Sequence, residues 1–328
     1  MLVASKYLLE INKLTEEQLK PASFCLQIQS NASSASLSSI MQAVESELVN
    51  MSVSEANMLV RALGRVREGK RVFALIEAMK RSKATTPNEE TFEFLANALV
   101  LTVERVSKVR AMADLPSPSQ SMPEVVFVGR SNVGKSSLVN YMVNRRALAS
   151  ISATPGHTKH FHFFAVNKGR SDNVPSFYLV DVPGLGYAEA EIEMQDSWRN
   201  LLERYMSVRD TLSLVFHLVD GRHGLTATDH LMLQLVKRAL QERREAGKPA
   251  FRFVVILTKM DKAKRANTAA IQRTVEAALR NEEFTNREEN EENMEAGGVS
   301  VIETSAVSKE GRDALWKVLY QTTIGLER

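Results

Sequence analysis

Residues 129–136, GRSNVGKS, have the composition and spacing of a loop that binds phosphate. Two glycines enclose a four-residue spacer, and a lysine and a serine follow the second glycine. In such a loop the backbone amides and the start of the next helix favour an anion. Lys135 can reach the outer phosphates of a nucleotide, and the Ser136 hydroxyl can coordinate Mg²⁺. The residues expected to contact phosphate are Gly129, Arg130, Ser131, Asn132, Val133, Gly134, Lys135 and Ser136.

A second motif, DVPG at 181–184, follows another apolar run. Asp181 is placed to hold a water molecule of the same Mg²⁺, and the Gly184 amide can face the terminal phosphate. An aspartate and a glycine at this spacing are common, so the position at a strand end is what makes the motif informative. The residues expected to lie near the nucleotide are Asp181, Val182, Pro183 and Gly184.

A third motif, TKMD at 258–261, has the residues that read a guanine base. The carboxylate of Asp261 can accept hydrogen bonds from guanine N1–H and from the exocyclic amine, whereas adenine offers no such pair. The stem of Lys259 can pack over the base. The stretch ETSA at 303–306 adds backbone that can meet guanine O6. The base site is therefore expected to consist of Thr258, Lys259, Met260, Asp261, Thr304, Ser305 and Ala306.

The elements that carry these motifs alternate between strands and helices after residue 122. The expected strands are 125–129, 161–166, 176–182, 212–220, 251–258 and 299–304, and the expected helices are 135–144, 191–206, 228–246, 266–281 and 311–326. Near-continuous apolar strands with helices between them indicate a parallel sheet that is covered on both faces. We therefore expect an α/β fold with a mostly parallel six-stranded sheet.

The first part of the chain has helical periodicity instead. Apolar residues at spacings of three and four predict helices at 57–66, 69–82, 91–100 and 103–112. Ala62 and Leu63 recur as Ala98 and Leu99, and the alternation of a shorter and a longer helix resembles the pentatricopeptide repeat. A third, degenerate hairpin is expected within 22–50. The alternative is an irregular helical bundle.

Composition changes divide the chain into three parts. The serine-rich stretch 30–39 predicts a loop or a helix start. Prolines concentrate just after residue 115 and indicate a linker. We expect an all-α region of helical hairpins at 1–114, a linker at 115–122 and an α/β domain at 123–328. The acidic stretch 281–295 is expected to be a solvated helix end followed by a loop.

Taken with TPGHT at 154–158, DVPGLGYA at 181–188 and VDGRHG at 219–224, the motifs resemble the EngB-type (YihA-like) GTPases over about residues 121–328. The resemblance implies a Ras-like fold, Mg²⁺-dependent binding of GTP and a role in assembly of the large ribosomal subunit. It also implies that Thr158 ligates Mg²⁺ in the GTP-bound state. The residues that it places near the phosphates are Gly156, His157, Thr158, Lys159 and His160. His157 stands where arginine is common, and the stretch 281–295 looks inserted.

Catalysis is expected to be slow without help. Leu185 follows DVPG at the place where Ras-type GTPases carry a glutamine that orients water, and leucine cannot do so. The expected catalytic groups are Lys135, the Gly184 amide and Asn132. Asn132 matches an asparagine that holds K⁺ in related GTPases, where the ion acts in place of an arginine finger. Loop geometry is an equally good explanation of Asn132.

Composition restricts the other possibilities. The net charge of +3 over 328 residues makes no electrostatic case for nucleic acid or membrane, so a basic surface would have to come from arrangement. The single cysteine, Cys25, excludes an intramolecular disulfide and suits a reducing compartment. No apolar run reaches the ~18–20 residues of a membrane span. The first residues make a poor secretory signal and a poor transit peptide.

These observations favour a GTP-binding switch protein with slow, Mg²⁺-dependent GTP hydrolysis. The expected partners are GTP and GDP together with large-subunit rRNA or a ribosomal precursor, and the protein is expected to be a monomer. The helical repeats would add an RNA contact and indicate a mitochondrion or chloroplast, with the cytoplasm as the alternative. Two other functions remain open: a regulatory GTPase with a protein effector, and an RNA-binding module whose GTPase has lost turnover.

Overall fold

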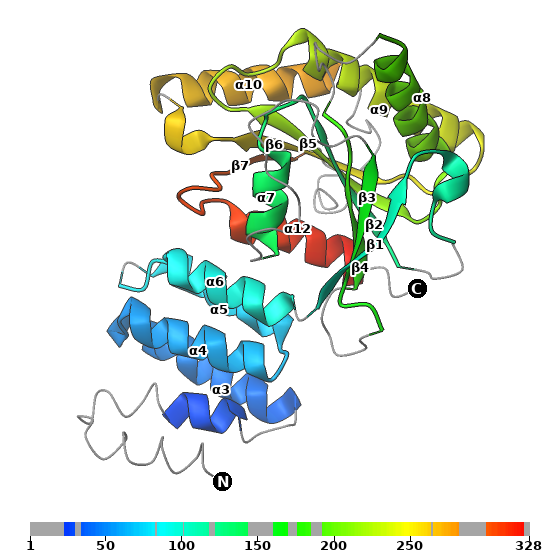
Figure 1. Cartoon of the computed structure of the whole chain (residues 1–328). Coiled ribbons are helices and arrows are strands. Elements are labelled where there is room, and N and C mark those ends of the chain that lie inside the picture. The colour runs from blue at the N-terminus through cyan, green and yellow to red at the C-terminus, as the bar shows by residue number, and fades with distance from the viewer. Residues whose placement is uncertain are drawn as a thin grey trace. The chain divides into compact units, whose positions relative to one another are not determined.

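The computed structural model describes residues 23–29, 34–82, 84–100, 102–117, 122–143, 160–169, 176–184, 192–263, 265–281 and 300–324 (Figure 1). The chain divides into two compact units. One unit comprises residues 1–101 and 171–174, and the other comprises residues 102–170 and 175–328.

The first unit is helical. After a helical segment at 23–29 come α3 (Ser34–Glu47), α4 (Val53–Arg65), α5 (Gly69–Arg81) and α6 (Glu89–Leu99). The last three confirm expected helices, and α3 shows that the serine-rich stretch contains a helix start. Ser52 and Asn88 cap α4 and α6 in capping boxes with Glu55 and Thr91, which satisfy backbone amides that a helix start leaves unpaired.

Helices α4 and α6 approach each other closely. A Cβ atom built on Gly64 of α4 would lie 2.6 Å from Cβ of Ala98 in α6, so the absence of a side chain at Gly64 sets this distance. A buried polar cluster joins the same helices: Asn57 donates to Asn88 Oδ1 at 3.0 Å and accepts from the Thr91 hydroxyl. Cys25 is buried, and burial raises the pKa of its thiol to about 11, which agrees with a small apolar role.

The second unit contains a seven-stranded sheet with the order β1-β3-β4-β2-β5-β6-β7. The strands are β1 (Val103–Val109), β2 (Glu124–Gly129), β3 (Phe161–Val166), β4 (Phe177–Asp181), β5 (Leu212–Asp220), β6 (Arg252–Thr258) and β7 (Ser300–Glu303). β1 and β3 pair antiparallel, as do β3 and β4, and the remaining pairs are parallel. The expected α/β fold is confirmed, with seven strands rather than six.

The additional strand corrects one sequence prediction. Residues 103–112 were expected to form a fourth helix, but 103–109 form β1 and 112–114 form a short 3₁₀ turn. β1 pairs with β3 from Val103 opposite Val166 to Val109 opposite Phe161, with an irregularity between Arg105 and Ser107. The division between the units precedes residue 102, whereas the proline-rich composition predicts a linker at 115–122.

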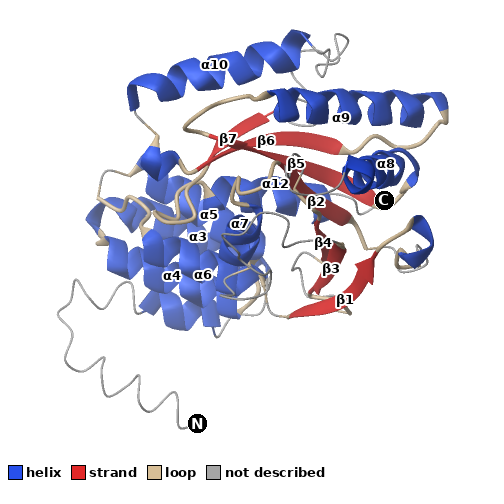
Figure 2. Ribbon diagram, turned by 45° about the horizontal axis from the view of Figure 1, so that its top comes forward, coloured by secondary structure: helices blue, strands red, loops and turns tan. Residues whose placement is uncertain are grey.

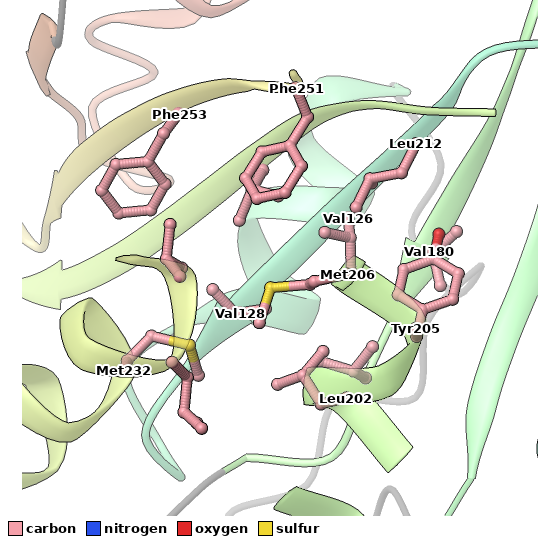
Figure 3. Close-up of a cluster of buried hydrophobic side chains, with 14 of the residues drawn as sticks. Val126, Val128, Val180, Leu202, Tyr205, Met206, Leu212, Met232, Phe251 and Phe253 are labelled. Carbon is pink, nitrogen blue, oxygen red and sulfur yellow. The ribbon is translucent and has the colours of Figure 1, made fainter. Parts of the chain in front are cut away.

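Helices cover both faces of the sheet (Figure 2). On one face lie α8 (Ile192–Val208), α9 (Ala227–Glu245) and α10 (Arg265–Asn281), and on the other lie α7 (Lys135–Met142) and α12 (Arg312–Ile324). Figure 3 shows part of the first interface, where Leu202, Tyr205 and Met206 of α8 meet strand residues such as Val126 and Val128. Because β2 and β5 are buried along almost their whole length, their carboxyl ends are held at fixed positions. None of the helices that the structure describes is long and apolar enough to cross a membrane.

Candidate nucleotide-binding site

The loop between β2 and α7 has a backbone that requires glycine at both ends. Gly129 has φ +149° and Gly134 has φ +111°, in the region that side chains disfavour. A Cβ on Gly129 would also lie 2.7 Å from the Leu218 carbonyl oxygen in β5, so this end of the loop lies against the neighbouring strand. A Cβ on Gly134 would meet nothing within 4 Å. The two glycines thus serve different purposes: close packing at the first, and backbone conformation at the second.

Lys135 is buried inside this loop. Its Nζ donates to the carbonyl oxygens of Gly129 at 3.1 Å and Arg130 at 3.3 Å. Burial lowers the pKa of Lys135 to about 8, although nearby Asp181 opposes the shift. Burial likewise raises the pKa of Asp181 to about 6, with Lys135 acting in the opposite direction. Both side chains are buried, and electrostatic interactions are stronger where there is little solvent.

The DVPG motif lies against the same loop. A Cβ on Gly184 would lie 2.8 Å from both Cα and the backbone nitrogen of Ser131, and 3.0 Å from Lys135 Nζ. Asp181 ends β4, which pairs with β2, so the sheet itself brings Asp181 to the loop. The structure therefore brings together the first and second motifs, as the sequence predicted.

The residues present suit a Mg²⁺ ion. Asp181 is buried, and its Oδ1 has no hydrogen-bond partner among the described residues. A buried carboxylate oxygen without a partner is costly unless a ligand satisfies it. Ser136 supplies a hydroxyl in the first turn of α7, and oxygen ligands of this kind are the ones that Mg²⁺ prefers.

The third motif lies at the other side of the loop. Thr258 donates its hydroxyl to the Val133 carbonyl oxygen at 2.7 Å, and Lys259 Nζ donates to the Asn132 carbonyl oxygen at 2.6 Å. These bonds attach the end of β6 directly to the phosphate loop. Asn132 and Lys259 both have left-handed backbones, with φ of 61° and 59°.

Asp261 is held by the loop that follows β7. The Ser305 hydroxyl donates to Asp261 Oδ1 at 2.7 Å, and the Met260 amide donates to the Thr304 carbonyl oxygen at 3.2 Å. The Asp261 side chain is exposed, while Thr304 and Ser305 are buried. The Ser305 hydroxyl thus orients the Asp261 carboxylate from the loop after β7.

Some of the expected site residues lie outside the described part of the chain, and the others adjoin β3, β4 and β7. Residues 156–159 and Leu185 lie outside the described part of the chain, as do residues 282–295 of the acidic stretch. His160 is half-buried and directly precedes β3. Val182 and Pro183 are buried after β4, and Ala306 follows Ser305 in the loop after β7.

Sequence reasoning missed Asp220 as a part of this site. Asp220 ends β5 and is 1% exposed, and it accepts a hydrogen bond from Lys259 Nζ at 2.9 Å. The sequence feature that could have identified Asp220 is its position directly after a long apolar run. His217, by contrast, lies in the core of the second unit, with Nε2 3.3 Å from Asp229 Oδ1. Trp316 is fully buried, and Trp198 is half-buried.

The fold and the three converging motifs define a P-loop GTPase. Residues 124–259 match a family model described as 50S ribosome-binding GTPase. Among solved structures, an Aquifex aeolicus Era variant bound to GDP and aluminium fluoride is similar with a TM-score of 0.44 and 18% identity, over 62% of this chain and 57% of that one.

Curated relatives identify the family. The chain is 42% identical to the probable GTP-binding protein EngB of Roseobacter denitrificans over 54% of this chain and 73% of that protein. It is 35% identical to the protein of the same name from Chlorobium phaeobacteroides, over 62% of this chain and 88% of the relative. The chain belongs to the EngB family of GTP-binding proteins and is a GTPase.

Proposed function

We propose that this GTPase acts as a GTP-dependent switch in assembly of the large ribosomal subunit. The observation that carries the proposal is the convergence of the phosphate loop, the Asp181–Gly184 segment and the Lys259–Asp261 base site at the carboxyl ends of neighbouring strands. The match of residues 124–259 to a model described as 50S ribosome-binding GTPase supports the ribosomal part.

The geometry supports a division of roles among the site residues. The amides of 129–136 and the ammonium of Lys135 would hold the phosphates, because the loop is closed around that lysine. The stem of Lys259 would cover the base, and Asp261 would accept hydrogen bonds from guanine. Phosphate contacts make no distinction between bases, so Asp261 would supply the selectivity.

Members of the family bind GTP with Mg²⁺, and Ser136, Thr158 and the partnerless oxygen of Asp181 would hold the ion here. Bound Mg²⁺ would neutralise charge that develops on the phosphates during hydrolysis. The Gly184 amide and Lys135 would face the same oxygens. The exposed Asn132 side chain is available to a K⁺ ion, while its left-handed backbone equally suits a role in loop geometry. We expect slow turnover in the absence of a partner.

Substitutions of two hydroxyl residues test the Mg²⁺ assignment. We expect Ser136→Ala to weaken Mg²⁺-dependent binding of both GTP and GDP by at least about tenfold, the usual cost of disturbing a metal site. Thr158→Ala should weaken GTP binding alone, because the first switch contacts the metal only when a γ-phosphate is present. Titrations of both nucleotides with and without Mg²⁺ measure this. Ser137→Ala, one residue further along α7, is the matched control, and an equal loss of both nucleotides in Thr158→Ala would contradict the switch assignment.

The ribosomal role is tested in cells. Full-length tagged protein should copurify with large-subunit rRNA when GTP turnover is blocked, and crosslinking should identify the RNA fragment. Copurification of one protein effector without rRNA would favour a regulatory GTPase. Association with rRNA but no GTP hydrolysis, with or without ribosomes, would favour an RNA-binding module whose GTPase has lost turnover.

The helical unit would add an RNA contact, as its resemblance to pentatricopeptide repeats implies. Support comes from exposed arginines of α4, one of which lies over a half-buried aromatic ring of α6. Arg61 lies over the Phe94 ring at 5.5 Å, and Arg65 is exposed one helical turn further along α4. Guanidinium groups and aromatic rings are the groups on which unpaired bases stack.

Removing the two arginines tests this contact. We expect the variant Arg61→Ala with Arg65→Ala to bind ribosomal RNA more weakly and to reduce the slope of log affinity against log salt by about 1 to 2. GTP affinity should not change. Lys80→Ala with Arg81→Ala, which removes two charges from α5, is the matched control. If both double variants bind RNA like the wild type, the helical unit does not hold RNA.

The resemblance of the helical unit to pentatricopeptide repeats also supports a place in a mitochondrion or chloroplast. Imaging of the tagged full-length protein tests this, and a cytoplasmic signal would contradict it. We propose that the protein acts as a monomer, which light scattering of the GTP-bound and GDP-bound forms would check.

A further inference from the structure

Asp220, at the carboxyl end of β5, collects hydrogen bonds from two basic residues. Its Oδ1 accepts from the backbone nitrogen of Arg222 at 3.1 Å and from Arg222 Nε at 2.9 Å. Its Oδ2 accepts from Arg222 Nη2 at 2.8 Å and from Lys259 Nζ at 2.9 Å. A third cation, Arg130 of the phosphate loop, lies 3.8 Å from Oδ2 through Nη2. Residues from three separate segments therefore meet at one carboxylate that is 1% exposed.

The charge of this carboxylate is strongly favoured. Burial alone would raise the pKa of Asp220, but hydrogen bonds from Arg222 and Lys259 outweigh burial and hold the pKa well below its usual range. The group therefore carries its negative charge throughout the neutral pH range. Charge-assisted hydrogen bonds of this kind are stronger than those between neutral groups.

Lys259 is fixed from two sides as a result. Its Nζ donates to the Asn132 carbonyl oxygen in the phosphate loop at 2.6 Å and to Asp220 at the end of β5. A lysine side chain has several rotatable bonds, and ordering it costs conformational entropy. Because two fixed acceptors hold Nζ, the lysine side chain is already ordered before any nucleotide binds. The two acceptors also determine the path of its stem.

We propose that Asp220 is a positioning residue for the base site, which holds Lys259 in the conformation that covers the guanine ring. This inference rests on the proposed nucleotide site. It predicts that Asp220 acts through Lys259 and chiefly slows nucleotide dissociation, because a stem already in place need not be ordered again at each binding event. Asparagine at 220 would keep the shape of the side chain but would present a neutral group to three cations.

The rate of dissociation of a fluorescent GDP analogue measures the effect. We expect Asp220→Asn to accelerate dissociation about tenfold, the scale of one lost charge-assisted hydrogen bond. Lys259→Met, which keeps an apolar stem without the ammonium, should accelerate it to a similar extent. In the Lys259→Met background, Asp220→Asn should add less than about twofold, because the lysine through which Asp220 acts is already gone.

The possible outcomes distinguish a failure of this inference from a failure of the proposed nucleotide site. Equal acceleration by Asp220→Asn in the presence and absence of Lys259 would overturn the inference, since a merely structural role predicts that result. No effect of Lys259→Met would instead contradict the proposed base site. Asp210→Asn is the matched control, because it makes the same change at an exposed residue in the turn before β5, where Asp210 pairs with Lys248. Dissociation should stay at the wild-type rate.

A second variant keeps the inference testable if Asp220→Asn fails to fold. Asp220→Glu keeps the charge and moves the carboxylate by one methylene, so we expect a smaller acceleration that also disappears in the Lys259→Met background. Thermal melting of each variant shows whether it is folded. A folded Asp220→Glu variant that accelerates dissociation independently of Lys259 would overturn the inference as well.

Discussion

Asp261→Asn should reduce GTP affinity by about 10²- to 10³-fold and shift the preference toward xanthine nucleotides. Asparagine keeps one oxygen that can accept from guanine N1–H but loses the second acceptor, a contact worth roughly 1–3 kcal/mol when a buried partner is left unpaired. The asparagine amide would also turn a donor toward a donor of guanine, whereas xanthine offers an oxygen in place of the exocyclic amine. Competition binding with GTP, ATP and xanthosine triphosphate measures the change.

The Ser305 contact makes this substitution a clean test. The Ser305 hydroxyl donates to Asp261 Oδ1 and can donate equally to the oxygen of an asparagine, so the loop after β7 should stay in place. Asp210→Asn again serves as the control for loss of one negative charge. If wild-type protein binds ATP as tightly as GTP, or if Asp261→Asn keeps its preference for GTP, the assignment of the TKMD motif to guanine is wrong.

Arg209→Met should destabilise the second unit by about 3–5 kcal/mol, the cost of leaving a buried charge without its partner. Glu124 at the start of β2 is 0% exposed, and Arg209 is 7% exposed. Arg209 donates to Glu124 through Nε and Nη2, at distances from 2.6 to 3.1 Å, and to the Pro116 carbonyl oxygen at 2.7 Å. Loss of the guanidinium would leave the carboxylate in the core. Urea unfolding, followed by the fluorescence of a bound GDP analogue and by circular dichroism, measures the change.

A second substitution shows whether the charge is the cause. Glu124 also accepts from the Tyr205 and Thr211 hydroxyls, at 2.7 and 2.9 Å. The double variant Arg209→Met with Glu124→Gln removes the orphaned charge, keeps an oxygen that accepts from one hydroxyl and offers an NH2 group that can donate to the other hydroxyl oxygen, so it should recover most of the lost stability. Lys248→Met breaks an ion pair whose Asp210 side chain is 65% exposed and should cost at most about 1 kcal/mol. If Arg209→Met lowers the free energy of unfolding no more than Lys248→Met does, this account is wrong.

The sequence alone determined the central strands and the phosphate loop. β2, β5 and β6 are buried on both faces and therefore read as continuous apolar runs, which need no knowledge of their partners. The phosphate loop depends on eight adjacent residues, and the requirement for glycine at 134 is set by the local backbone alone. The motifs could be placed at strand ends, and hence near one another, because parallel strands present their carboxyl ends at one edge of a sheet.

The identity of β1 could not be obtained in this way. Val103, Val106 and Val109 have the spacing of a helix, and the alternation that marks a strand is missing. The structure gives the reason: the pairing with β3 skips Val106, because a bulge there shifts the register by one residue. Only the edge of β3, more than fifty residues away, supplies the hydrogen bonds that make this segment a strand.

Tertiary structure also decided the two charged clusters. Asp220 receives its partners from positions 130, 222 and 259, and Glu124 receives its partners from positions 205, 209 and 211. Each aspartate, glutamate or arginine taken alone is most often a solvated surface residue. Local spacing determines where a strand, a turn or a phosphate loop forms, whereas the burial of a charge depends on cations that distant segments bring to the same point.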